Sequence, residues 1–161
     1  MNPPNDLPVI ALTLGDPAGT RPGLIPRLLS QPETTRQSNV VLIGDPWLWA
    51  EGQRIAGTRV ETVPLQSLDA ARTRTDSSHA ALIAIDTVRA ADVHRGKAEA
   101  AGGASVLKVL DTCMDAAKRG AIDAICFAPL NKYAMKQGGL EHEDELHHFA
   151  EYLGVTGYFC E

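Results

Sequence analysis

Residues 122–132 read IDAICFAPLNK, and this stretch decides the fold. Its apolar run, Ala124–Phe127, ends in a proline, an amide and a lysine, which is typical of a strand that leads into a turn. Before it, residues 96–119 carry apolar side chains with a period of about 3.6 residues, which predicts a long amphipathic helix. A further apolar strand is predicted at residues 80–85. A strand, a helix and a strand with short connections predict an α/β fold with a mainly parallel sheet flanked by helices.

The rest of the chain shows the same alternation of strand and helix patterns. Buried strands are predicted at residues 7–14 and 40–43, helices at 24–29 and 47–55, and an exposed edge strand at 58–63. Pro26 lies inside the first of these helices, so that this helix is expected either to start late or to kink. Residues 66–78 are polar and predict a solvated loop. Residues 1–6 predict a flexible tail, which leaves residues 7–161 as a single α/β region.

The composition excludes several classes of protein. Hydrophobic residues make up 44% and charged residues 22% of the 161 residues, as in an ordinary globular domain. A net charge of −5 argues against a nucleic-acid partner or an anionic membrane surface. The chain contains no apolar run of roughly 18 residues and no leader pattern, so we expect no membrane partner and a cytoplasmic protein.

The three cysteines are widely spaced and form no CxxC pair, which excludes a zinc ribbon or a redox motif of that type. Cys126 lies in a predicted strand and Cys113 in a predicted helix. Both are expected to be small core residues rather than nucleophiles.

Two turns carry candidate binding groups. Asn131 and Lys132 follow the strand at 124–127, where open α/β sheets bind their ligands, and an amide beside a lysine suits a phosphate or a carboxylate. The alternative is a plain turn with a solvated lysine. The other turn, GDPAG at residues 15–19, contains Gly15 and Asp16 and is neither the GxGxxG pattern nor a P-loop. It is expected to present backbone N–H groups to a ligand.

A polar cluster at residues 141–148 permits two interpretations. His142, Glu145 and His148 are of the types that bind divalent metals, but they share a helix face only roughly, and no HExxH motif is present. The other interpretation is a helix that begins after Asp144 as its N-cap, with acidic residues in its first turn.

Together, LTLGDPAG at residues 12–19 and APLNK at residues 128–132 resemble one family, the 4-hydroxythreonine-4-phosphate dehydrogenases of pyridoxal-phosphate biosynthesis. The resemblance spans residues 9–159, with Gly96-Lys97, Gly103 and Gly120 in matching order. It implies oxidation, with decarboxylation, of a phosphorylated hydroxy acid such as 4-phosphohydroxy-L-threonine, with NAD(P) and a divalent metal (Zn, Mg or Co). It also implies the two-domain fold of isocitrate and isopropylmalate dehydrogenases, working as a homodimer with the active site in the interdomain cleft.

This sequence departs from the family pattern in three places. The chain corresponds to the N-terminal half of the family, so the metal-binding histidines and cofactor-contacting segments have no counterparts, and the truncated chain alone is expected to be inactive. The family's Ile-Gly-Pro-Glu reads TRPG at residues 20–23. The family's substrate-contacting His-Thr pair aligns without gaps to Glu145 and Leu146, whereas a three-residue gap brings His142 to the histidine position.

A glutamate at the histidine position disfavours a phosphate dianion nearby, because like charges repel. The resemblance therefore implies a divergent branch, whose small-molecule substrate is a phosphorylated or carboxylated compound, such as a different diol or hydroxy acid. The rival hypothesis is a non-catalytic truncated paralogue that acts as a ligand-binding or association domain.

Overall fold

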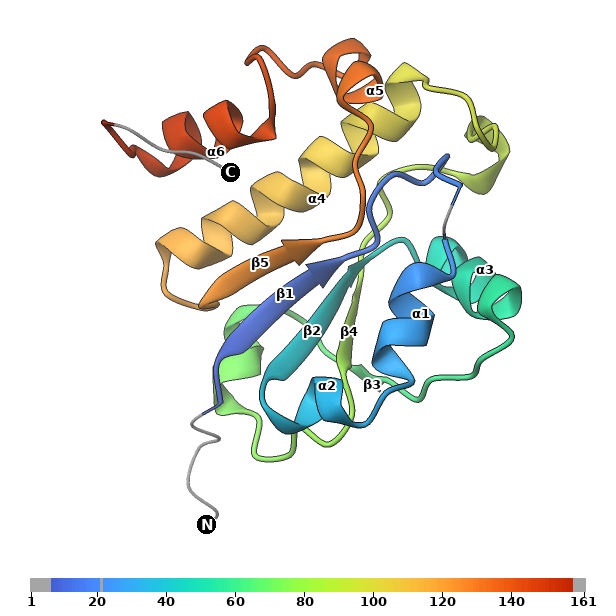
Figure 1. The fold of residues 1–161 in the computed structure, drawn as a ribbon. Coiled ribbons are helices and arrows are strands. Elements are labelled where there is room, and N and C mark those ends of the chain that lie inside the picture. The colour runs from blue at the N-terminus through green and yellow to red at the C-terminus, as the bar shows by residue number, and fades with distance from the viewer. Residues whose placement is uncertain (1–6, 21, 158–161) are drawn as a thin grey trace.

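The computed structural model describes residues 7–20 and 22–157. Its centre is a five-stranded sheet in the order β3-β4-β2-β1-β5, in which all neighbouring strands run parallel (Figure 1). The strands are β1 (Val9–Thr13), β2 (Asn39–Gly44), β3 (Val63–Pro64), β4 (Ala81–Ala84) and β5 (Ala124–Phe127). The prediction of a mainly parallel sheet is confirmed. The predictions made for residues 1–6, Arg21 and Cys160 fall outside the described residues.

Helices cover both faces of this sheet (Figure 1). They are α1 (Leu24–Leu29), α2 (Glu33–Arg36), α3 (Pro46–Ala56), α4 (Ala100–Lys118), α5 (Lys132–Gln137) and α6 (Glu145–Leu153), with 3₁₀ turns η1 (Asp69–Thr73) and η2 (Ala90–Asp92). Side chains of α1 and α3 pack on one face and side chains of α4 on the other. No helix among the described residues is long and apolar enough to cross a membrane.

The central strand β2 explains why the sheet needs helices on both faces. All six of its residues are buried. Val41 and Ile43 belong to the core beneath α4, while Val40 and Leu42 belong to the core beneath α1 and α3. A strand with two buried faces requires a continuous apolar run, as its sequence shows.

Two predicted boundaries were wrong. The helix predicted from Gly96 begins at Ala100, because Gly96 has a left-handed φ of +78° and Glu99 is extended. The strand predicted over residues 58–63 is limited to Val63–Pro64. The backbone N–H of Val60 donates instead to Gln53 Oε1 (2.8 Å), so this segment bonds to α3 rather than to β4.

Two further predictions need adjustment. The helix at 24–29 spans the predicted residues and does not start late, because Pro26 lies in its first turn, where the missing N–H has no helical partner to lose. The segment at 66–78 is not a plain solvated loop, because it contains η1. Leu68 and Ala71 of this segment are buried in the core beneath α4.

The two cysteines in the described part differ. Cys113 is fully buried, as predicted, and burial raises the pKa of its thiol to about 12, which makes it inert as a nucleophile. The prediction for Cys126 was wrong, because this residue is exposed. In the described chain β5 pairs with β1 alone, so it is an edge strand, and Ala124 and Phe127 are exposed with it.

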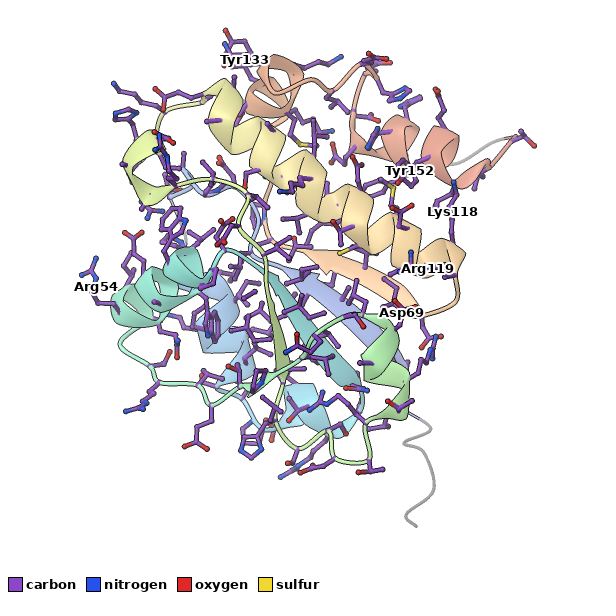
Figure 2. The ribbon with its side chains drawn as sticks, turned by 180° about the vertical axis from the view of Figure 1, so that it is seen from behind. Arg54, Asp69, Lys118, Arg119, Tyr133 and Tyr152 are labelled. Atoms are coloured by element: carbon purple, nitrogen blue, oxygen red, sulfur yellow. The ribbon has the colours of Figure 1, made fainter. Side chains whose placement is uncertain are left out.

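Charged pairs join η1 to the α4–β5 connection. Asp69 lies 3.1 Å from Arg119, and these two side chains point toward one another in Figure 2. Arg72 donates two hydrogen bonds to Asp123 (2.7 and 2.8 Å), which also accepts one from the Val9 N–H (2.7 Å). These bonds hold the pKa of Asp123 below its usual value.

The Arg72–Asp123 pair predicts a specific pH dependence. Because the pKa is lowered in the folded state, the pair stabilises the fold above the unfolded pKa of about 3.9. That stabilisation is lost as the pH falls through the lower, folded pKa. In an NMR titration we expect Arg72→Ala to raise the Asp123 midpoint and Arg89→Ala, at an exposed pair with Asp92, to leave it unchanged. An Asp123 midpoint that is the same in Arg72→Ala and wild type would contradict this assignment.

Candidate functional site

The two turns singled out in the sequence meet at the carboxyl end of the sheet. Gly15 follows β1 with a left-handed φ of +76°, and a Cβ built on it would lie 2.8 Å from the Ala128 Cβ. The backbone N–H of Asp16 donates to the Pro129 carbonyl (3.3 Å). The structure thus brings together two motifs that are separated by more than a hundred residues. The contact leaves room for glycine alone at position 15.

A cavity of about 310 Å³ lies beside this contact. Its lining comes from both turns: Leu14, Asp16, Gly19, Thr20, Pro22, Ala128 and Pro129. The Asp16 carboxylate accepts a hydrogen bond from the Ala18 N–H (2.9 Å), which fixes the first turn.

A third loop, between β4 and α4, holds the first turn in place. Arg95 donates to the Gly19 carbonyl (2.8 Å) and lies 2.8 Å from the Glu51 carboxylate of α3. The Gly96 N–H donates to the Ala18 carbonyl (2.7 Å). The sequence did not single out Arg95, because nothing in its spacing places it near residues 17–19.

Asn131 and Lys132 lie where β5 leads into α5. The Asn131 side chain accepts a hydrogen bond from the Ala134 N–H (3.0 Å), so it is the N-cap of α5. Its side-chain oxygen therefore fixes the start of α5, and the expected contact between Asn131 and a ligand stays a prediction. Lys132 is the first residue of α5, and its side chain is about half exposed.

Lys132 faces a buried carboxylate. Its Nζ lies 3.6 Å from Glu145 Oε2, while the Glu145 side chain is only 12% exposed. That oxygen is buried and has no hydrogen-bond donor among the described residues. The structure therefore brings together two of the predicted site residues, and the glutamate partly neutralises the lysine.

Asp144 is the N-cap of α6, as predicted. It accepts a hydrogen bond from the His147 N–H (2.9 Å), and this bond, together with the His147 side chain, holds the pKa of Asp144 below its usual value. Leu146 follows Glu145 in α6. It lines an open apolar groove of about 690 Å³ between β5, α4 and α6, with Ile125, Phe127 and Phe149.

The three candidate metal ligands, His142, Glu145 and His148, do not converge on a common point. His142 Nδ1 lies 3.5 Å from Glu151, His148 Nε2 lies 2.8 Å from Asp111, and Glu145 faces Lys132. The two histidine rings pack on one another with centroids 5.4 Å apart. Over residues 7–20 and 22–157, no group of three or more His, Cys, Asp or Glu side chains is arranged to hold a metal ion. The metal-binding interpretation of this cluster was wrong, since each side chain has a different partner.

A buried aspartate that the sequence analysis did not single out lies close to this edge. Asp45, 2% exposed, follows β2 and accepts hydrogen bonds from the N–H groups of Thr87 (2.9 Å) and Val88 (3.2 Å) and from the Thr87 hydroxyl. The Thr87 hydroxyl also lies 2.6 Å from the Ser105 hydroxyl of α4. A carboxylate just after the apolar run at residues 40–43 was the available signal. The network ties together β2, the segment after β4, and α4.

The chain is similar to known proteins over most of its length. The family profile of pyridoxal phosphate biosynthetic protein PdxA matches residues 36–161. A Pseudomonas aeruginosa protein, named provisionally as a 4-hydroxythreonine-4-phosphate dehydrogenase, is 40% identical over all of this chain and 47% of its own length. A Clostridium botulinum protein, named provisionally as a D-threonate 4-phosphate dehydrogenase, is 23% identical over 86% of this chain and 41% of its own.

A solved structure agrees with these matches. The crystal structure of a 4-hydroxythreonine-4-phosphate dehydrogenase from Burkholderia phymatum superposes with a TM-score of 0.82 at 27% identity, covering 95% of this chain and 46% of that one. The chain therefore spans about half the length of the relatives that it matches. The profile match and the 40% identity, with the two turns in contact at one edge of the sheet, show that this chain belongs to the PdxA family.

Proposed function

We propose that this chain supplies one substrate-binding wall of a family dehydrogenase that oxidises a small hydroxy acid. The observation that carries the proposal is the convergence of the Gly15-Asp16 turn with the turn that leads to Lys132. Ligands of open α/β sheets bind at this edge. The names of the relatives support a dehydrogenase role at the level of the family.

The residues of this chain can bind and orient a substrate. Lys132 would attract a carboxylate or phosphate oxygen, and the Gly15 and Asp16 turn would form the facing wall. A bound NAD(P) would accept hydride and a bound divalent metal would polarise the hydroxyl. The described residues do not fit the metal, because no three or more of their His, Cys, Asp or Glu side chains are arranged to hold one. In the proposed enzyme the complementary half, in a homodimer, supplies both groups.

Glu145 is proposed as the position that sets substrate preference. Its carboxylate lies 3.6 Å from Lys132 and cancels part of the positive charge. A singly charged substrate oxygen is therefore favoured there over a phosphate dianion, because the dianion would also face the buried glutamate. This supports a branch that acts on a hydroxy acid or diol other than 4-phosphohydroxy-L-threonine.

The activity test uses the chain alone and together with the complementary half of the Pseudomonas aeruginosa relative. We expect no substrate-dependent NAD(P)H from the chain alone, and measurable NAD(P)H once the halves are combined. In the combined enzyme Lys132→Ala should lower kcat/KM about 100-fold, as loss of a charged substrate contact does. Lys136→Ala, on the same helix and exposed, is the control.

The possible results separate the claims. Turnover by the chain alone would contradict the division of the site between two halves. A combined enzyme that folds but oxidises neither D-threonate 4-phosphate nor 4-phosphohydroxy-L-threonine, nor their unphosphorylated forms, would contradict the proposed reaction.

The exposed edge strand bears on the rival function, an autonomous binding domain. Phe127 is 38% exposed and lines the apolar groove between β5, α4 and α6. Exposed apolar surface of this kind promotes association. We expect light scattering to detect self-association of the chain and Phe127→Asp to reduce it severalfold. Tyr133→Asp, which replaces an aromatic residue 65% exposed on α5, is the control (Figure 2). A monodisperse wild-type monomer would instead favour the autonomous domain.

A further inference from the structure

A second groove lies at the opposite end of the sheet from the candidate site. It is formed by α2, the segment before β3 and the segment before β4, so it borders the amino-terminal ends of these strands (Figure 1). Its volume is about 590 Å³, within the usual range for small-molecule sites of about 300–1,000 Å³. Neither the family match nor the proposed function assigns a role to it.

The groove has an apolar floor that is part of the protein core. Leu29 and Ala80 are buried in the core beneath α1 and α3, and Val60 packs against the same cluster. Because these side chains are fixed by core packing, the floor is preformed. It can accept the apolar or planar part of a ligand.

Polar contacts between segments hold the walls of the groove together. The Thr35 hydroxyl of α2 donates to the Ser78 carbonyl (3.1 Å). On the other side, His79 Nε2 lies 3.7 Å from the Glu61 carboxylate, and His79 Nδ1 lies 3.0 Å from the Ser78 hydroxyl. The Thr35–Ser78 and His79–Glu61 contacts each join two different segments, so the groove does not depend on a single loop.

The groove carries positive charge on an acidic protein. Arg36 and Arg59 line it against a single glutamate, Glu61, although the chain as a whole has a net charge of −5. Arg36 has one weak ion pair, at 4.0 Å from the exposed Glu33. Within the described residues, the Arg59 guanidinium has no hydrogen bond or ion pair. Its N–H groups are thus available to a ligand oxyanion.

We propose that this groove binds a small organic phosphate, with the phosphoryl group on Arg59 and Arg36 and the apolar body on the Leu29–Val60–Ala80 floor. Guanidinium groups match phosphate geometry with paired N–H donors. The site is separate from the Lys132 edge and does not depend on the proposed dehydrogenase reaction.

The experiment is an NMR titration of the 161-residue chain at low ionic strength, with AMP, inorganic phosphate and adenosine as probes. We expect AMP to bind saturably and to shift the amide signals of residues 59–61 and 77–80. Arg59→Ala should weaken AMP binding at least about 10-fold, as loss of a charge-assisted contact does. Arg54→Ala, on the outer side of α3 in Figure 2, and Lys132→Ala should leave it unchanged.

Several results would overturn the proposal. Equal AMP affinity in wild type and Arg59→Ala would contradict the proposed contact with Arg59. Amide signals that do not shift at millimolar AMP would contradict the proposed site. Equal affinity for AMP and inorganic phosphate would show that the apolar floor does not contribute to binding. Because Arg59 is exposed, unchanged circular dichroism of Arg59→Ala is expected, so loss of binding reports the contact and not the fold.

Discussion

Gly103→Ala is expected to destabilise the protein by about 3 kcal/mol, whereas Gly102→Ala, one residue earlier in α4, is expected to be neutral or stabilising. A Cβ at Gly103 would lie 1.8 Å from the Ala134 carbonyl oxygen of α5, while a Cβ at Gly102 would meet nothing closer than 3.5 Å. Both changes add the same methyl group and gain the same helix propensity, so their difference isolates the contact between α4 and α5.

Urea unfolding measures this difference directly. Because α5 begins with Lys132, the Gly103 contact also sets the position of the candidate site, and we expect faster amide hydrogen exchange in α5 of Gly103→Ala. Equal unfolding free energies for the two variants would show that the helices do not touch at Gly103. Gly138, whose built Cβ would lie 2.2 Å from the Ala104 nitrogen, marks the same contact from α5.

Asp45→Ala is expected to lower the free energy of unfolding by about 2–4 kcal/mol. The substitution leaves the N–H groups of Thr87 and Val88 and the Thr87 hydroxyl without their acceptor, in a position where Asp45 itself is 2% exposed. A buried donor without a partner costs about 1–3 kcal/mol, and more than one is affected here.

The control for Asp45 is Asp92→Ala. Asp92 accepts two hydrogen bonds from the exposed Arg89, so its loss should cost less than about 1 kcal/mol. Thermal unfolding should show the same order. If Asp45→Ala and Asp92→Ala proved equally stable, the buried network would not hold the end of β2 to the segment after β4.

Local patterns predicted the parts of the fold that are settled by burial alone. The apolar run at 40–43 predicted β2, because a strand covered on both faces can contain almost no polar residue. The apolar period in residues 96–119 predicted α4, and Asp144 predicted the start of α6. The helix α4 was predicted to start too early, because Gly96 adopts a left-handed conformation. The strand β3 was also predicted to start too early, because the Val60 N–H donates to the Gln53 side chain.

The candidate site was predicted in part. Both turns were recognised, because strands that end in glycine, proline and polar residues are typical of ligand edges. No spacing rule predicted that Asn131 caps a helix. Arg95 was missed because the carbonyl that it binds, that of Gly19, lies more than seventy residues away. The error for Cys126 arose because an apolar strand gives no sign of whether it lies in the centre or at the edge of a sheet.

The sequence by itself determined the α/β class, the parallel sheet and the two turns, since these depend on side-chain periodicity and on residues with restricted backbones. Only the tertiary structure decided that the Gly15 turn touches Ala128, that Glu145 faces Lys132, and that Asp45 closes a buried network. The physical reason is that these contacts join segments far apart in the chain. Their energies come from close approach and from shielding from water, which exist only once the sheet and its helices have packed.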